Sequence, residues 1–239
     1  MDCFWISLFS GGKDSSWALY RALEAGYPID RLVTVHPAGD SYLYHVPATQ
    51  LAELAAESIG IDLVEIEPDD FEATAPRAES STARGDRELA PLAAQLRSLA
   101  ETHGGIDGIV AGAVESEYQT ARIQRLCDRL EAELFAPLWQ ADPKSAATSM
   151  IDAGFEITIV RVAADGLDES WLGRTYDYGS LAELADLNNT HGVHVLGEGG
   201  EFETIVTDGP HMSRPIELDY ETTYDGVRGR IRVTNARLG

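Results

Sequence analysis

The chain has 239 residues, 44% of them hydrophobic, which is enough to bury a sizeable core in one large domain or two small ones. It carries 40 acidic and 18 basic residues, and the resulting net charge of −22 argues against tight, charge-driven binding of nucleic acid. So large an acidic excess is typical of proteins from a salt-rich, halophilic cytoplasm, where screening relieves the self-repulsion.

The first predicted elements are an apolar strand at residues 6–9 and a helix that ends at Gly26. The loop and first helical turn between them read Ser10, Gly11, Gly12, Lys13, Asp14 and Ser15. Such a turn can close its amide groups around an anion, at the point towards which the helix N-terminus is directed. Lys13 adds a positive charge, the serines add hydroxyl donors, and Asp14 can hold a hydrated Mg²⁺. We therefore expect this segment to bind a polyphosphate.

The segment differs from the common P-loop, because Ser7 and Asp14 stand where that motif has Gly and Ser or Thr. It resembles the pyrophosphate loop of the N-type ATP pyrophosphatases, which cut ATP between its α and β phosphates and release AMP. The alternative is an ordinary strand-to-helix turn with a capping side chain. Six specified residues between a predicted strand and helix favour the pyrophosphate loop.

Hydrophobic periodicity predicts that strands and helices alternate through the first half of the chain. Strands are expected at 32–35, 63–66 and 106–111, and helices at 48–59, 88–102 and 117–133. This alternation predicts an α/β fold with a doubly wound parallel sheet over residues 1–135, the ATP-binding domain. The loops after residues 9, 35 and 111 should then meet at one crevice. The irregular segment 68–86 is either a lid over that crevice or a solvated insertion.

The second half, residues 136–239, is expected to form a smaller α+β lobe, and the family resemblance described below implies that this lobe binds the substrate. Helices are predicted at 144–153 and 180–188, and strands at 155–162, 194–196, 202–208, 216–224 and 229–235. Pro137 and Pro143 mark the region where the texture of the sequence changes.

Residues 112–122 form a second candidate cluster at the predicted crevice. Gly112 permits a close approach of the backbone, Ser116 is a candidate helix cap, and Glu117, Tyr118 and Arg122 follow it on the helix. The Arg122 guanidinium could balance phosphate charge with its planar fork. An ordinary amphipathic helix with a solvated polar face explains the same pattern equally well.

A third cluster places three glycines and three carboxylates between two predicted strands. It reads Gly197, Glu198, Gly199, Gly200, Glu201, Phe202, Glu203 and Thr204. The spacing does not fit the dinucleotide-binding fingerprint, because Phe202 occupies the position of its last glycine. The cluster suggests a cationic ligand, such as an ammonium group or a metal, and a solvated acidic turn is the alternative.

Other residues add little chemistry. The cysteines, Cys3 and Cys127, provide neither a disulfide framework nor metal-ligand spacing. His36 and His45 fall on loops at the predicted crevice, whereas His191 and His194 flank a predicted strand. No apolar stretch approaches membrane-spanning length and no signal peptide is visible, so we expect a cytoplasmic protein without a membrane segment.

Taken together, these motifs resemble the diphthine–ammonia ligase family over about residues 5–218. The matching segments are 10–15, 40–45, Gly112 with 116–119 and Arg122, 136–139, 153–155, 172–173 and 197–204. The resemblance implies a fold of the N-type ATP pyrophosphatases (HUP-like). It also implies ATP-dependent amidation of diphthine, the modified histidine of translation elongation factor 2, through an acyl-adenylate. The products would be diphthamide, AMP and pyrophosphate, with ammonium as the nitrogen source.

The resemblance also assigns roles to residues. Ser10, Gly11, Gly12, Lys13, Ser15 and Gly112 would hold ATP; Lys13, Asp14 and Arg122 would be catalytic, with Asp14 positioning Mg²⁺. Substrate would be bound by Tyr44, His45, Glu117, Tyr118, Glu198, Gly199, Gly200, Glu201, Glu203 and Thr204. Within this set, the trimethylammonium group of diphthine would be received by Glu198, Glu201 and Glu203, helped by an aromatic face such as Tyr118 or Trp139. Glu117 and Tyr118 would line the nucleotide pocket or the passage to the other lobe.

Some features depart from the family pattern. Thr120 and Gln124 stand where the family often has a basic and an acidic residue, and segment 72–87 is longer than usual. The tail beyond Asp219 matches no family segment that we can place. Two other functions stay open: a different N-type ATP pyrophosphatase, such as a tRNA-modifying enzyme, and a non-catalytic ATP sensor. A homo-oligomer is also compatible with the sequence.

Overall fold

The computed structural model describes residues 4–35, 48–66, 90–114 and 117–239. The predicted substrate-binding residues Tyr44 and His45, the candidate cap Ser116 and the irregular segment 68–86 lie outside these ranges. Glu117 and Tyr118 belong to a described helix, but their side chains are not described.

A five-stranded parallel sheet forms the N-terminal half, with the strand order β3-β2-β1-β4-β5. Its strands are β1 (Trp5–Leu8), β2 (Ile29–Val35), β3 (Asp62–Ile66), β4 (Gly108–Val110) and β5 (Glu133–Phe135). Its helices are α1 (Lys13–Glu24), α2 (Ala48–Ile59), α4 (Ala90–His103) and α5 (Glu117–Leu130). The predicted doubly wound sheet is therefore confirmed, and the strand order reverses between β1 and β4, where such sheets bind ligands.

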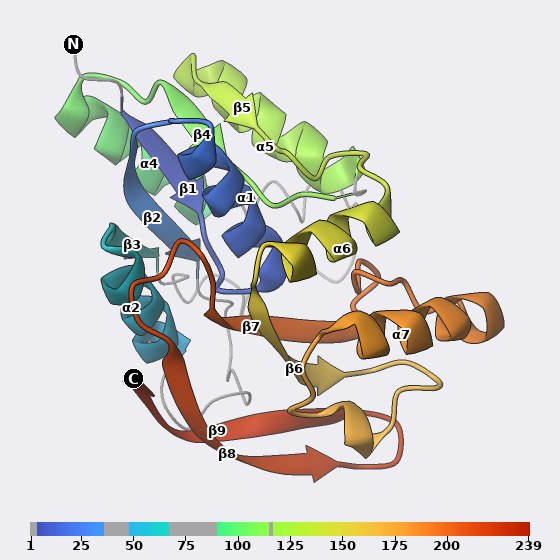
Figure 1. The fold of residues 1–239 in the computed structure, drawn as a ribbon. Coiled ribbons are helices and arrows are strands. Elements are labelled where there is room, and N and C mark those ends of the chain that lie inside the picture. Colours follow the sequence, from blue (N-terminus) through green and yellow to red (C-terminus); the bar gives the residue numbers. More distant parts are fainter. Residues whose placement is uncertain (1–3, 36–47, 67–89, 115–116) are drawn as a thin grey trace, which may run out of the picture.

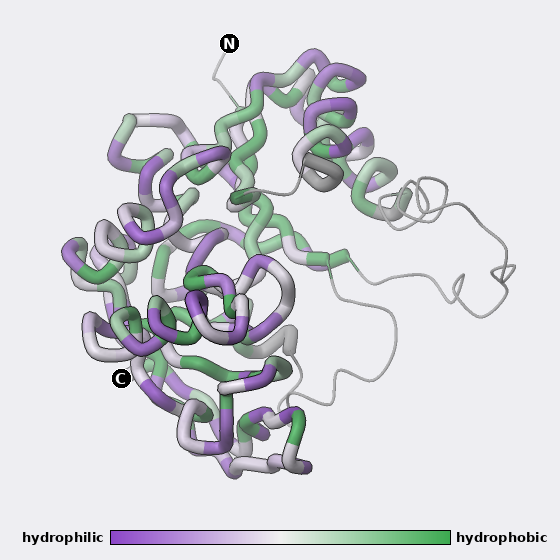
Figure 2. Tube along the Cα trace, turned by 90° about the vertical axis from the view of Figure 1, so that its right-hand side faces the viewer, coloured by the Kyte–Doolittle hydropathy of each residue, from purple (hydrophilic) through white to green (hydrophobic). Residues whose placement is uncertain are grey.

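Alternating side chains of β1 explain why helices cover both faces of the sheet. Trp5 packs with Ala18 and Ala22 of α1, whereas Ile6 belongs to a cluster with Leu96 of α4 and Leu126 of α5. Because successive strand residues point to opposite faces, α1 lies on one side of the sheet and α4 and α5 on the other. Figure 2 shows the hydrophobic stretches in the middle of the molecule, with hydrophilic residues on peripheral turns.

Strand β5 was not predicted, and the helix expected over residues 117–133 ends earlier in the structure than expected. The helix ends at Leu130, where Glu131 adopts a positive φ of 55° and the N–H of Ala132 donates to the carbonyl of Cys127. This is the bonding pattern of a left-handed helix end, which usually carries glycine. With glutamate instead of glycine at that position, no local pattern indicates that the chain turns into β5.

A four-stranded antiparallel sheet forms the C-terminal half, with the order β7-β6-β9-β8. Its strands are β6 (Glu156–Val162), β7 (Phe202–Asp208), β8 (Ile216–Tyr224) and β9 (Gly229–Leu238). It is accompanied by α6 (Pro143–Asp152), the 3₁₀ turn η2 (Glu169–Trp171) and α7 (Tyr178–His191). The expected α+β lobe is confirmed.

The strand expected at 194–196 is wrong, because these residues form a turn. Gly197 N–H donates to the carbonyl of His194 at 2.9 Å, and Leu196 N–H donates to the His194 ring at 3.2 Å. Val195 and Leu196 are buried, as their apolar side chains predict, but they belong to a turn whose Leu196 carbonyl accepts from Lys13 Nζ.

The two sheets share one hydrophobic cluster, and β7 lies at their junction (Figure 1). Trp17 and Tyr20 of α1 contact the Phe155 ring, each at 5.6 Å between ring centroids. A second contact joins the C-terminus of α2 to the segment after β7, where Ser213 N–H donates to the carbonyl of Ser58 at 2.8 Å. Among the described helices, none combines the length and apolar character needed to cross a membrane.

Candidate active site at the junction of the two sheets

The predicted phosphate loop connects β1 to α1 at the carboxyl end of the sheet. Gly11 has a φ of 75°, a conformation that glycine adopts without strain. Ser15 Oγ lies 3.1 Å from Ser10 Oγ and donates to the Gly12 carbonyl at the same distance. Gly12 caps α1 without a side-chain hydrogen bond, so acceptors for the first amide groups of the helix must come from elsewhere.

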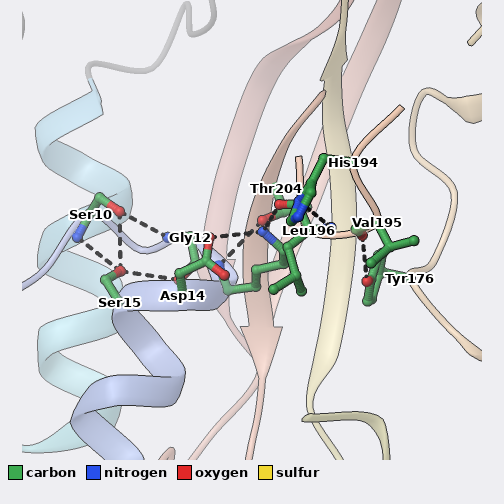
Figure 3. A network of polar contacts seen from close by, with 10 residues as sticks. Ser10, Gly12, Asp14, Ser15, Tyr176, His194, Val195, Leu196 and Thr204 are labelled. Carbon is green, nitrogen blue, oxygen red and sulfur yellow. Dashed lines mark hydrogen bonds and ion pairs between the residues drawn. The ribbon is translucent and has the colours of Figure 1, made fainter. Parts of the chain in front are cut away.

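Residues of the third sequence cluster pack directly on this loop (Figure 3). The main-chain N–H of Lys13 donates to Thr204 Oγ1 at 3.2 Å, and Val206 N–H donates to the Gly11 carbonyl at 2.9 Å. A Cβ on Gly12 would lie 3.3 Å from the Thr204 carbonyl oxygen. The loop after β1 and strand β7 therefore form one structural unit, although they come from different halves of the chain.

The Lys13 ammonium group lies inside this unit, with the residue 3% exposed. It donates to Asp14 Oδ2 at 2.8 Å and to the carbonyl of Leu196, and it lies 5.6 Å from the centre of the Phe202 ring. A buried charge requires such partners, because an unpaired ammonium would lose most of its hydration energy. The ammonium group is thereby fixed between the two halves of the molecule.

The turn that presents the Leu196 carbonyl is held by two further contacts. The buried Tyr176 hydroxyl donates to the Val195 carbonyl at 2.7 Å, and His194 N–H donates to Glu201 Oε1 at 3.1 Å. Burial, with a smaller contribution from the Asp14 charge, raises the pKa of Tyr176. Sequence reasoning missed Leu196 and Tyr176: the first acts through its backbone, and a single tyrosine outside any motif carries no signal.

Asp14 was predicted to position Mg²⁺, and its surroundings are compatible with this role. One carboxylate oxygen pairs with Lys13, whereas Oδ1 is buried and has no hydrogen-bond partner among the described residues. No group of three or more His, Cys, Asp or Glu side chains suited to a metal occurs in the described ranges. The donor set therefore fits a magnesium ion held by one carboxylate together with phosphate oxygens of a nucleotide.

The second cluster is only partly brought to the loop. Gly112 follows β4 and packs against α1, where an added Cβ would lie 2.6 Å from the Asp14 carbonyl carbon and from Ser15 N. Its missing side chain thus allows the helix that carries Lys13 to approach the sheet. Arg122 is 5% exposed on α5 and is engaged within the fold.

The glutamates of the third cluster have different surroundings. Glu203 forms an ion pair with Arg161 of β6. Glu201 turns back onto the 194–196 turn, and its second oxygen, Oε2, is buried without a hydrogen-bond partner among the described residues. Glu198 also has a partner in the fold. Arg161 therefore neutralises the Glu203 carboxylate, so this residue offers less negative charge to a cation than we expected from the sequence.

Comparison with protein families gives two matches that together account for most of the chain. The model of the diphthamide synthase N-terminal domain matches residues 4–133, and that of the diphthamide synthase C-terminal domain matches residues 142–238. The second match reaches the end of β9, so the tail beyond Asp219, which we could not place from the sequence, belongs to this C-terminal domain.

The chain is similar in sequence to diphthine–ammonia ligases of several eukaryotes. The diphthine–ammonia ligase of Danio rerio is 33% identical over 237 residues, covering 91% of this chain and 87% of the fish protein. The diphthine–ammonia ligase of Homo sapiens is 33% identical over 224 residues, covering 89% and 82%.

Among solved structures, a predicted subunit of tRNA methyltransferase from Methanocaldococcus jannaschii is similar in fold. The two superpose with a TM-score of 0.50 at 21% sequence identity, covering 87% of this chain and 98% of that one. The likeness supports the fold alone.

Proposed function

The chain belongs to the diphthine–ammonia ligase family, and we infer that it converts diphthine to diphthamide with ammonia and ATP. The observation that supports this function best is the contact between the phosphate loop and strand β7 through Lys13 and Thr204. A ligase of this kind must hold ATP and a carboxylate acceptor side by side, and this junction brings the two predicted binding segments together.

We propose that the loop 10–15 holds the phosphates of ATP. Its serine hydroxyls, the amide groups of α1 that follow Lys13 and the Lys13 ammonium are donors, and negative charge grows on the pyrophosphate as it departs. Lys13 would exchange its bond to the Leu196 carbonyl for one to a phosphate oxygen. Gly112 and Arg122 complete the predicted nucleotide side.

Asp14 is the residue that would hold Mg²⁺, through the oxygen that Lys13 does not use. The ion would neutralise charge on the phosphate oxygens when ATP is bound. Lys13 and Asp14 are paired at 2.8 Å, so the carboxylate also keeps the ammonium group in place before ATP arrives.

The proposed reaction has two steps. A carboxylate oxygen of diphthine attacks the α-phosphorus of ATP, and the bond to the β-phosphate breaks to release pyrophosphate. The nitrogen of ammonia then attacks the acyl carbon of the adenylate. The bond between this carbon and the bridging oxygen breaks, AMP leaves with that oxygen, and the new amide nitrogen loses a proton.

The trimethylammonium group of diphthine is proposed to lie near the 197–204 segment. Glu201 offers a carboxylate oxygen that no described residue binds, and Glu198 belongs to the same turn region. An anionic group balances the fixed charge of a quaternary ammonium, and an aromatic face adds a cation–π contribution. Translation elongation factor 2 is the proposed carrier of the diphthine residue.

The test is an assay at high salt with ATP, Mg²⁺, ammonium and elongation factor 2 that carries diphthine. We expect AMP to form together with the mass change for replacement of OH by NH₂ on the factor. A factor with the unmodified histidine is the matched control and should yield no AMP. AMP without the mass change would point to another acceptor, and ATP binding without AMP would favour the sensor.

A further inference from the structure

His194 begins the tight turn that presents the Leu196 carbonyl to the Lys13 ammonium group. Its main-chain N–H donates to Glu201 Oε1 at 3.1 Å, and its carbonyl accepts from Gly197 N–H at 2.9 Å. Its ring nitrogen Nδ1 accepts from Leu196 N–H at 3.2 Å. The first two bonds use only the backbone of His194, so any residue at this position could form them. The third bond requires this side chain.

The peptide group that joins Val195 to Leu196 is held at both ends. Its oxygen, the Val195 carbonyl, accepts from the buried Tyr176 hydroxyl at 2.7 Å. Its N–H, that of Leu196, donates to the His194 ring on the other side (Figure 3). Because a peptide group is planar, a bond at each end fixes its rotation. One tyrosine and one histidine side chain therefore set the orientation of the backbone at this point.

The next peptide group carries the acceptor for Lys13. Its oxygen is the Leu196 carbonyl, and its N–H, that of Gly197, donates to the His194 carbonyl. Gly197 has a φ of 72°, and a Cβ at this position would lie 2.8 Å from the Phe202 carbonyl oxygen. The turn is thus closely packed on β7. A rotation of the first peptide group would carry the second with it and move the Leu196 oxygen away from the ammonium group.

The hydrogen bond at the ring also defines the chemical form of His194. A main-chain N–H can donate only to a ring nitrogen without a proton, so the proton of the neutral ring is on Nε2. Asparagine can form the same bond, because its side-chain oxygen accepts from the main-chain N–H two residues further on in an Asx turn. Leucine has no acceptor. Glutamine places its amide one bond further out, near the position of Nε2.

We propose that His194 is a positioning residue for Lys13, which acts by holding the Leu196 carbonyl in place. The Lys13 ammonium group is fixed by this carbonyl and by Asp14 Oδ2 at 2.8 Å. A positive charge that is already in place stabilises the negative charge that grows on a departing pyrophosphate. This catalytic consequence rests on the proposed function, whereas the position of Lys13 in the folded protein does not.

The lysine content of the chain allows the position of Lys13 to be measured directly. Lys13 and Lys144 are the lysines of the chain, and Lys144 is exposed. NMR of protein with ¹³C- and ¹⁵N-labelled lysine therefore gives one Nζ signal from the buried ammonium group and one from an internal reference. The spectra are recorded without nucleotide for the wild type, His194→Leu, His194→Gln and His194→Asn. His191→Asn, at an exposed position, is the matched control.

His194→Leu and His194→Gln should shift the Lys13 Nζ signal and leave the Lys144 signal unchanged, because they remove the acceptor at the position of Nδ1. His194→Asn restores an acceptor there and should keep the Lys13 signal close to that of the wild type. Circular dichroism checks that each variant is folded, and His194→Gln decides the result if His194→Leu is not. A wild-type Lys13 signal in the folded variants without the acceptor overturns the proposal.

The kinetics of AMP formation give the second readout. His194→Leu should lower kcat roughly tenfold, about the value of one hydrogen bond, with a smaller change in KM for ATP because the serine hydroxyls of the loop are unaltered. His194→Asn should recover most of this loss. A wild-type kcat in folded His194→Leu or His194→Gln also overturns the proposal. If the wild type itself forms no AMP, the proposed function fails, and the lysine signals alone decide whether His194 positions Lys13.

Discussion

The main-chain N–H of Lys13 and the hydroxyl of Thr204 are 3.2 Å apart, although 191 positions separate these residues in the chain. This hydrogen bond connects the first turn of α1 to the first residues of β7. It places the third sequence cluster at the phosphate loop, and the predictions for the active site start from it.

Thr204→Val should slow AMP formation by up to about tenfold, because it removes the acceptor of the Lys13 amide while preserving the shape of the side chain. Thr207→Val is the matched control on the same strand, since the Thr207 hydroxyl donates to the main-chain carbonyl of Glu156 and not to the phosphate loop. Steady-state kinetics with varied ATP would check this. Equal rates for both variants would show that the contact has no part in ATP handling.

Asp14→Asn should reduce the rate of AMP formation by about a hundredfold or more, because the amide cannot replace a charged oxygen beside a cation. The variant keeps nearly the same shape, but it removes the anionic partner of the buried Lys13 ammonium, so its thermal unfolding temperature should fall and the rate is measured below that temperature. Titration with Mg²⁺ should show a higher requirement for the ion. An unchanged Mg²⁺ requirement would remove Asp14 from the metal site.

Tyr176→Phe should lower the turnover rate several-fold, because it frees the Val195 carbonyl and loosens the turn whose next carbonyl binds Lys13. The free energy of unfolding should fall by about 1–2 kcal/mol for the lost buried hydrogen bond. A turnover rate that stays at the wild-type value despite this lower stability would mean that the turn has no influence on Lys13. Chemical denaturation and AMP release measure the two effects separately.

Gly112→Ala should destabilise the fold by about 2–4 kcal/mol, because the new methyl group would lie 2.6 Å from the backbone of α1 and the helix must shift. Gly154→Ala is a useful comparison, since Gly154 has a φ of 83° but no atom within 4 Å of the added carbon. It should cost only about 1–2 kcal/mol of conformational strain. Equal losses of the free energy of unfolding by the two variants, measured by urea denaturation, would show that α1 shifts at little cost to accommodate the methyl group.

Stability should fall as the pH drops from 6.5 towards 4, in part because of His211. Burial lowers the pKa of this residue from 6.5 to about 4, and neither ring nitrogen has a partner among the described residues. Between these values the unfolded chain binds a proton that the folded protein does not, so the contribution is complete above pH 6.5 and is lost at lower pH.

The effect of His211 on the free energy of unfolding is at most about 3 kcal/mol across this range. His211→Phe should flatten that part of the pH dependence, whereas His191→Gln, at an exposed position, should not change it. Denaturation curves at several pH values and constant salt would show the difference. Parallel curves for the wild type and His211→Phe would contradict the assignment.

The sequence predicted well what local patterns encode. The apolar run, the glycine turn and the helix that ends at Gly26 were all found where expected, because each depends on residues close together in the chain. The doubly wound topology followed from the alternation of these elements. The loop 10–15 is accordingly the part of the candidate site that sequence reasoning located best.

Contacts between distant segments escaped prediction. Nothing in the sequence indicates that the carbonyl of Leu196 accepts from Lys13, since any residue can offer a carbonyl. The apolar pair Val195 and Leu196 suggested a strand, because burial alone does not distinguish a strand from a packed turn. The pairing of Glu203 with Arg161 depends on the register of β6 and β7, which a single sequence does not specify.

The aromatic contact between α1 and the second sheet has a mechanical consequence. Trp17 and Tyr20 pack on Phe155, and the Phe155 ring stacks on His211 with centroids 5.1 Å apart. The helix that carries Lys13 therefore packs against both halves of the molecule. A hinge motion between the two halves would have to separate this aromatic cluster. An N-terminal half separated from the rest of the chain would expose the Trp17 and Tyr20 rings to water.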